Sequence, residues 1–254
     1  MGEDGTAGLE DGFALINHYV ANNQWQKAVE TGKKYTKKYP SNYYIGLKYA
    51  KALCETGQYQ PCISLLSRMQ VLPNEGSYAG RAVYREANLY RAMEQLSHKN
   101  YKQVVKSVET SKEWPENLGV GKPYDNMIDN RLEDYLEAKA AAGQGDSRKT
   151  SALLAAVADY TISRSHFESG NLLSALALRE SGKVQEADHM VAAWSTDFPE
   201  NRVVQWCTAI YRGEKEKAVG MLQSRNDQTN TTPWEASFRD SNFDLIVRLF
   251  STEQ

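Results

Sequence analysis

The apolar residues of this 254-residue chain fall in helix-length stretches that are separated by short polar turns. Ala, Leu, Glu, Lys and Gln, which favour helices, dominate these stretches. No pair of alternating β-branched runs is joined by Asn-Gly or Asp-Gly, the usual sign of a β-hairpin. The pattern predicts an all-α fold.

A short phrase recurs between pairs of predicted helices: one or two turn residues, an aromatic or polar residue, and a small residue that opens the second helix. We expect the Gly or Asn of each phrase to end the first helix in a left-handed conformation, and the small residue to let the second helix pack closely. The five instances are Asn23-Gln24-Trp25 to Ala28, Gly57-Gln58-Tyr59 to Cys62, Lys99-Asn100-Tyr101 to Val104, Gly182-Lys183-Val184 to Ala187, and Gly213-Glu214-Lys215 to Ala218.

Proline marks the expected ends of the second helices, because it disfavours α geometry in the residue before it. These ends are Tyr39-Pro40, Leu72-Pro73, Trp114-Pro115 and Phe198-Pro199. First helices are then expected near residues 10–22, 43–56, 77–97, 124–142, 166–181 and 201–212, with a terminal helix from Asn242 to Phe250.

The phrase resembles the tetratricopeptide repeat, a helical hairpin with a period of about 34 residues. Ala28 and Cys62, the small residues of the first two phrases, are 34 residues apart. The resemblance implies a right-handed α-solenoid of about six hairpins, in which the terminal helix caps the last hairpin. We expect residues 1–254 to form a single repeat domain with irregular units and a loop over residues 114–124 between the third and fourth units.

Residues from about Trp114 to Leu249 also resemble the C-terminal helical repeat region of large Bacteroidetes-type proteins, which carry a β-rich N-terminal domain of unknown function. The most specific match is Pro115-Glu116-Asn117-Leu118-Gly119, and the segment from Leu176 to Lys183 follows it. Many of these proteins occur beside carbohydrate-utilisation genes, so the resemblance implies a bacterial, carbohydrate-related setting. It supplies no catalytic residues.

Composition narrows the class of function. Charged residues make up 24% of the chain and the net charge is −2, without a basic half, which argues against a nucleic-acid surface. No apolar run is long enough to insert in a membrane, and residues 1–12 lack the features of a signal peptide, so we expect a soluble chain and leave its compartment open. Cys54, Cys62 and Cys207 form no Cys-x-x-Cys pair and are expected to be buried apolar residues.

Motifs that carry chemistry are weak in this sequence. The Gly119–Pro123 loop has the glycines and the Lys of a phosphate loop, but it ends in Pro where such a loop needs Ser or Thr. The four histidines are widely separated and predict no metal site. Asp125 and Asp129 lie at an expected helix N-terminus, where the helix dipole favours negative charge, and do not indicate a glycosidase pair. We therefore expect no catalytic residue, cofactor or metal.

Tetratricopeptide arrays bind their partners through the face formed by the first helices, so the resemblance directs the search to these helices. Tyr together with Lys or Arg is the mixture enriched at binding hot spots. Asn17 also matches an Asn of the site by which this family holds a C-terminal carboxylate, although Phe13 stands where that site has Lys. The residues expected to bind a partner are Asn17, Tyr44, Lys51, Tyr135, Lys139 and Arg179.

These observations predict a non-catalytic interaction scaffold that docks to another domain of the same polypeptide or to a protein partner. The alternative is a carbohydrate-binding surface, in which an exposed row of aromatic rings stacks on a glycan. A third alternative, an enzyme, requires a deep pocket where ionisable groups converge.

Overall fold

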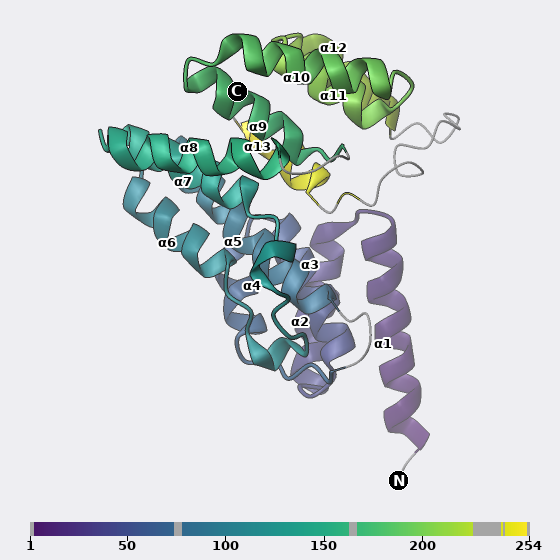
Figure 1. Cartoon of the computed structure of the whole chain (residues 1–254). Helices are drawn as coiled ribbons and strands as arrows, with labels where there is room; N and C mark the ends of the chain where they lie inside the picture. The colour runs from purple at the N-terminus through teal and green to yellow at the C-terminus, as the bar shows by residue number, and fades with distance from the viewer. Residues whose placement is uncertain (1–2, 74–77, 163–166, 226–239, 241, 253–254) are drawn as a thin grey trace. The chain divides into compact units, whose positions relative to one another are not determined.

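The computed structural model describes residues 3–73, 78–162, 167–225, 240 and 242–252. Within these ranges the chain forms thirteen α-helices and two short 3-10 helices and contains no strand (Figure 1). The prediction of an all-α fold is confirmed. None of the described helices is both long and apolar enough to span a membrane.

The contacts within the chain divide it into two compact units. The first consists of Met1–Ala92 with Lys106–Ile128, and the second of Met93–Val105 with Asp129–Gln254. The boundary therefore runs through the α5–α6 hairpin, formed by α5 (Ala79–Ser97) and α6 (Tyr101–Ser111).

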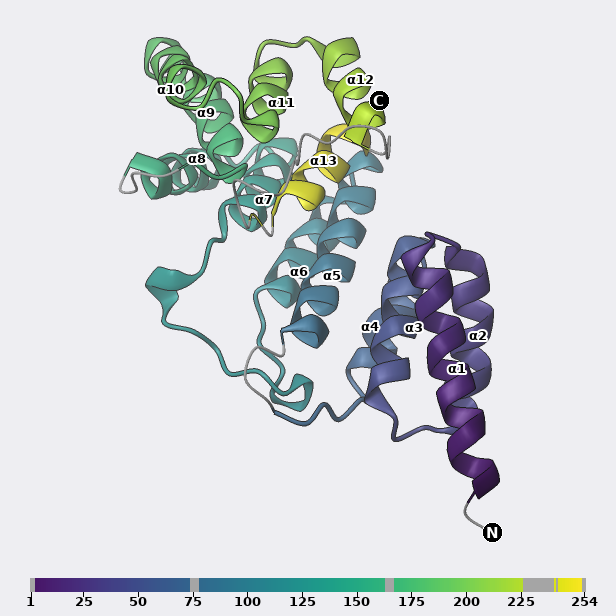
Figure 2. The same cartoon turned by 90° about the vertical axis from the view of Figure 1, so that its right-hand side faces the viewer.

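In the first unit, helical hairpins pack side by side (Figure 2). Helix α1 contacts α2 and α3, and α3 contacts α2 and α4, so the first helix of one hairpin touches the first helix of the next. The elements of this unit, besides its parts of α5 and α6, are α1 (Glu3–Ala21), α2 (Trp25–Lys38), α3 (Tyr43–Glu55), α4 (Tyr59–Leu66), η1 (Glu116–Leu118) and η2 (Asp125–Met127).

The second unit repeats this pattern of contacts. Helix α9 contacts both helices of the preceding hairpin, α7 and α8, as well as its own partner α10 and the next first helix, α11. The helices are α7 (Arg131–Gly143), α8 (Ser147–Ile162), α9 (Gly170–Glu180), α10 (Val184–Asp197), α11 (Arg202–Tyr211), α12 (Lys215–Arg225) and α13 (Phe243–Thr252). Both units thus have a helical repeat-like architecture.

The same main-chain turn closes all six hairpins. A residue with positive φ stands two positions before each second helix, and the residue after it donates its N–H to the carbonyl five positions earlier, at 2.8–3.0 Å. This is the Schellman arrangement, which satisfies carbonyls at the end of a helix. The left-handed residues are Asn23, Gly57, Lys99, Gly145, Gly182 and Gly213.

The structure corrects one of the expected turns and adds another. In the Lys99-Asn100 turn the left-handed residue is Lys99, with φ of 59°, and not Asn100, because the position in the turn decides the conformation. Gly145 forms the sixth turn, which the sequence phrase did not identify. Its second helix has Thr150 at the position where the other hairpins have buried small residues; these are Ala28, Cys62, Val104, Ala187 and Ala218.

Three helix boundaries differ from the prediction by six residues or more. Helix α1 begins at Glu3, before the expected residue 10. The first helix expected from residue 124 begins only at Arg131, because Asp125–Met127 is a 3-10 helix and Ile128 is extended. Helix α4 ends at Leu66, well before the expected stop at Pro73.

The end of α4 is held by a segment that follows α6. The Nδ2 of Asn117 donates to the carbonyls of Leu66 and Met69 at 2.9 and 2.8 Å, and the N–H of Val71 donates to the carbonyl of Asn117 at 2.9 Å. Gly119 is left-handed, and a Cβ at this position would lie 2.8 Å from the carbonyl oxygen of Val71. The Pro115–Gly119 segment is therefore a structural clip within the first unit.

A buried arginine joins three helices of the second unit. The Arg131 guanidinium, at the start of α7, binds both carboxylate oxygens of Asp129 at 3.0 and 2.8 Å and one of Glu168 at 2.6 Å. It also donates to the side chains of Thr161 on α8 and Asn171 on α9 at 2.6 and 2.7 Å. Because a buried charge is costly unless it is paired, this network fixes the geometry of α7, α8 and α9.

Candidate interaction site on the first helices

The left-handed turn residue gives every hairpin a common register. We define the first-helix face as the positions three, six, ten and thirteen residues before it, because these spacings place side chains on one side of a helix. The six residues predicted to bind a partner all fall on this face. Asn17, Lys51 and Lys139 occupy the position six residues before the turn, Tyr135 the position ten, Tyr44 the position thirteen and Arg179 the position three.

Lys51 is held by two carboxylates of the first unit. Its Nζ lies 2.7 Å from Oε1 of Glu55 and 2.6 Å from Oε1 of Glu86, so it links α3 to α5. Burial lowers the pKa of Lys51, but the attraction and hydrogen bonds of Glu86 and Glu55 outweigh this effect and raise the pKa overall. Because two carboxylates already neutralise its charge, Lys51 stabilises the packing of neighbouring hairpins.

Tyr135 and Lys139 come together in the second unit. The Tyr135 hydroxyl and the Lys139 Nζ both donate to Oε1 of Glu180, each at 2.7 Å, which joins α7 to α9. The Lys139 Nζ also lies 4.9 Å from the centre of the Tyr135 ring. Tyr135 is only 2% exposed, so its ring belongs to the core and is closed to a partner.

Arg179 packs on the next first helix. Its Nη1 donates to the carbonyl of Tyr211 at 2.8 Å, and its guanidinium lies 4.7 Å from the centre of the Tyr211 ring. The Tyr211 hydroxyl donates to Oδ1 of Asp188 at 2.8 Å. Burial, and then this hydrogen bond, raise the pKa of Tyr211 to about 12. Arg179 keeps an exposed position despite these contacts.

An open groove lies on the first-helix face of α1 and α3. It has a volume of about 340 Å³ and is lined by Leu9, Glu10, Phe13, Asn42 and Tyr44. Phe13 is 39% exposed and Tyr44 is 53% exposed, and their rings meet edge to face with centroids 6.4 Å apart. Two large aromatic side chains are thus presented to solvent at neighbouring positions of adjacent first helices.

Sequence reasoning identified Tyr44 but not Phe13. The sequence signal that could have identified Phe13 is its large aromatic ring at the position ten residues before the turn. In four other hairpins the side chain at this position is buried: Leu89, Tyr135, Leu172 and Val203. Asn17 follows Phe13 by one turn of α1 and is half-buried. The groove therefore combines one predicted residue with one that the sequence pattern did not single out.

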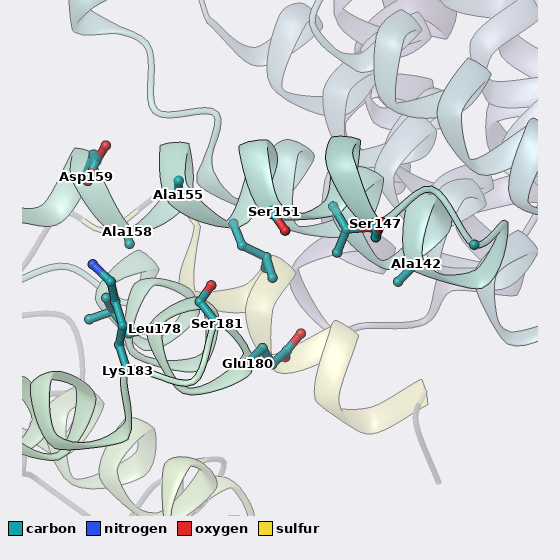
Figure 3. Close-up of a pocket in the computed structure, with 13 residues that line it drawn as sticks. Ala142, Ser147, Ser151, Ala155, Ala158, Asp159, Leu178, Glu180, Ser181 and Lys183 are labelled. Carbon is teal, nitrogen blue, oxygen red and sulfur yellow. The ribbon is translucent and has the colours of Figure 1, made fainter.

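A second cavity, of about 540 Å³, lies beside α8 in the second unit (Figure 3). One wall is formed by small side chains of α8, including Ser147, Ser151 and Ala155, and the other by Leu178 and Lys183 around the turn after α9. None of the residues that line this cavity is aromatic. It therefore offers no ring on which a sugar could stack.

The two acidic positions weighed in the sequence are both engaged in ion pairs. Oδ1 of Asp125 lies 2.7 Å from Nζ of Lys122, on the loop with the phosphate-like glycines. Asp129 belongs to the Arg131 network, where its Oδ2 is 2.8 Å from Nη2. Each of these groups has a structural partner.

Across the described ranges, ionisable groups do not gather as a metal site requires: no group of three His, Cys, Asp or Glu side chains is placed to hold an ion. His18, His98 and His189 are exposed, and His166 lies outside the described residues. The three cysteines are buried free thiols, as expected, and burial raises the pKa of Cys207.

Comparison of the chain with protein-family models, with curated proteins and with solved structures returns no match. The function must therefore be inferred from the geometry of the site. The groove on α1 and α3 is the part of the first-helix face where two aromatic rings are exposed.

Proposed function

We propose that this chain is a non-catalytic interaction module that binds a protein partner, or another domain of the same polypeptide, through the groove on α1 and α3. The observation that carries the proposal is the exposure of Phe13 and Tyr44 in that groove. Exposed aromatic rings beside polar groups are typical of interface hot spots, because binding removes their large apolar surface from water.

The groove also contains a donor suited to a peptide. Oδ1 of Asn42 accepts the N–H of Ile45 at 3.0 Å and so caps α3. In the described part of the chain its Nδ2 has no acceptor, which leaves it free to donate to a main-chain carbonyl of a partner. An apolar side chain of the partner would fill the space between the rings.

The proposed architecture is a right-handed α-solenoid of six tetratricopeptide-like hairpins. Its support is the common turn of the six hairpins and the contact of successive first helices within each unit. A single repeat domain over residues 1–254 remains a prediction, as does the carbohydrate-related setting.

A carbohydrate-binding surface is favoured by no specific observation. It requires a row of exposed rings, whereas Tyr135 is buried in the second unit and the cavity beside α8 has no aromatic lining. Tyr44 and Phe13 form a pair on two helices and do not extend into a row along the described first helices.

The test is photo-crosslinking in cells that express the whole polypeptide. A benzoylphenylalanine at position 44 should form one discrete adduct, with a partner protein or with another segment of the same polypeptide. The same probe at Tyr124, which is 81% exposed but lies outside the first-helix face, is the matched control and should not form that adduct.

A Phe13→Ser substitution should reduce the yield of the adduct at position 44, because it removes the neighbouring ring of the groove. Equal adducts at positions 44 and 124, or no adduct at position 44, would show that the groove is not an interaction site.

A further inference from the structure

A separate cavity of the second unit lies between α9, α11, α12 and α13 and is largely apolar. Its volume of about 340 Å³ falls in the range of small-molecule sites. Its apolar walls include Leu176, Ile210, Val219, Leu222 and Phe250.

The side chains lining this cavity that carry a charge at neutral pH are all cations: Arg179, Arg212 and Lys215. Among the described residues, none of these three cations forms an ion pair. Glu214 is adjacent in sequence, but its carboxylate pairs with Lys217 at 2.8 Å and does not line the cavity. Arg212 also attracts the Glu214 carboxylate, but among the described residues no acidic side chain lines the cavity. A positively charged lining beside an apolar wall favours a ligand with negative charge.

A buried donor in the same wall needs an acceptor. Trp206 lines the cavity and is 1% exposed, and its Nε1 has no hydrogen-bond partner. Its ring is fixed by edge-to-face contacts with Phe243 and Phe250, at centroid distances of 5.3 and 6.3 Å. Buried indole N–H groups normally find an acceptor, so this one is an unsatisfied donor close to the cavity.

We infer that this cavity binds a small organic carboxylate with an apolar body. The apolar walls accept the body, and the cations attract the carboxylate. The site lies in the second unit and does not depend on the groove on α1 and α3.

The experiment is isothermal titration of the whole chain with octanoate, with 1-octanol and octylammonium as ligands of the same apolar length. We expect octanoate to bind about tenfold more tightly than either control, because one charge-assisted hydrogen bond has about that effect. Equal binding of octanoate and 1-octanol, or no binding of octanoate, would overturn the inference.

Three variants locate the site. The double variant Arg212→Gln/Lys215→Gln changes exposed side chains and should weaken octanoate about tenfold while leaving 1-octanol unchanged. Lys183→Gln removes a cation from the cavity beside α8 and is the matched control, which should leave octanoate binding unchanged.

Val219→Trp should abolish octanoate binding by filling the cavity from a half-exposed position, without removing a cation. Circular dichroism of each variant confirms that it is folded. If Val219→Trp and the double variant both bind octanoate like the parent chain, the ligand does not occupy this cavity.

Discussion

Among single residues, the space around a glycine decides whether a side chain can replace it. Gly170 opens α9 against the Arg131 guanidinium, and a Cβ there would lie 2.5 Å from Cζ of Arg131. Gly220, within α12, has no atom within 4 Å of the same position. The first glycine is required by the buried ion-pair network, and the second is not required by any contact.

Gly170→Ala should therefore destabilise the chain by about 1–3 kcal/mol, the usual cost of overpacking. Gly220→Ala is the matched control and should stabilise it by about 0.5–1 kcal/mol, since alanine favours a helix more than glycine does. The midpoint of urea unfolding, followed by circular dichroism, measures both. Changes of the same sign in the two variants would contradict the role assigned to Arg131.

Among elements, the hairpin turn is the unit that repeats. Its hydrogen bonds are the same in all six hairpins, while its left-handed position holds four glycines, one Asn and one Lys. The backbone conformation of the turn is therefore constant. The residue at the left-handed position changes only the free energy that this conformation costs.

Lys99→Gly should stabilise the chain by about 1 kcal/mol, because Lys99 is left-handed with φ of 59° and glycine adopts this region without a steric penalty. Gly57→Ala should destabilise it by about 1 kcal/mol for the same reason. Gly121→Ala, at a glycine with no close atoms and no positive φ, should have little effect. Thermal unfolding curves of the three variants provide the comparison; a loss of stability in Lys99→Gly would contradict the assignment.

Tyr211 links α11 to α10 through Asp188, and this link should make stability depend on alkaline pH. Its pKa is about 12 in the folded chain against an ordinary value of about 10. Above pH 10 the unfolded chain loses this proton while the folded chain keeps it, so the contribution is complete below pH 10 and is lost as the pH rises through 12.

In Tyr211→Phe this component should be absent, so stability should fall less steeply between pH 10 and 12. Urea midpoints at several pH values measure the slope, and tyrosinate absorbance at 295 nm reports the ionisation. A slope equal to that of the parent chain would mean that Tyr211 titrates normally.

The turns were the most predictable elements, because glycine or asparagine before a small residue is a local signal. The Gly145 turn was missed because Thr150 is not small and the phrase was incomplete. The early end of α4 was also missed, since it depends on hydrogen bonds from Asn117, which is 51 residues away from Leu66. The position of a proline in the sequence does not indicate a hydrogen-bond partner that lies so far along the chain.

The candidate sites were less predictable than the turns. The six predicted residues share one face of the first helices, but Tyr135 is buried whereas Tyr44 is exposed. Their role in binding stays a prediction. The cavity beside Trp206 depends on the packing of four helices and leaves no local pattern in the sequence. Exposure and cavities arise from tertiary packing, which periodicity alone does not determine.

For the whole molecule, the division into two units should limit how far the destabilisation caused by one substitution spreads. Helix α13 belongs to the second unit, where Ile246 is fully buried and Phe243 packs against Trp206 of α11. In repeat-like folds each element depends mainly on its neighbours, so loss of packing in α13 should spread first to α11.

Ile246→Ala should destabilise the second unit by about 2–5 kcal/mol, the usual effect of removing a buried aliphatic side chain. Hydrogen–deuterium exchange should become faster in α11 and α13, while α1 to α4 of the first unit keep their protection. Equal acceleration in both units would show that they unfold as one cooperative body.

The clip between Asn117 and the end of α4 has a consequence for biosynthesis. Leu66 and Met69 are synthesised about fifty residues before Asn117. Until Asn117 has been synthesised, we expect their carbonyls to be hydrogen-bonded to water. The second hairpin therefore matures only after the third has been translated, and a nascent chain arrested before Asn117 presents an unfinished helix end to chaperones and proteases.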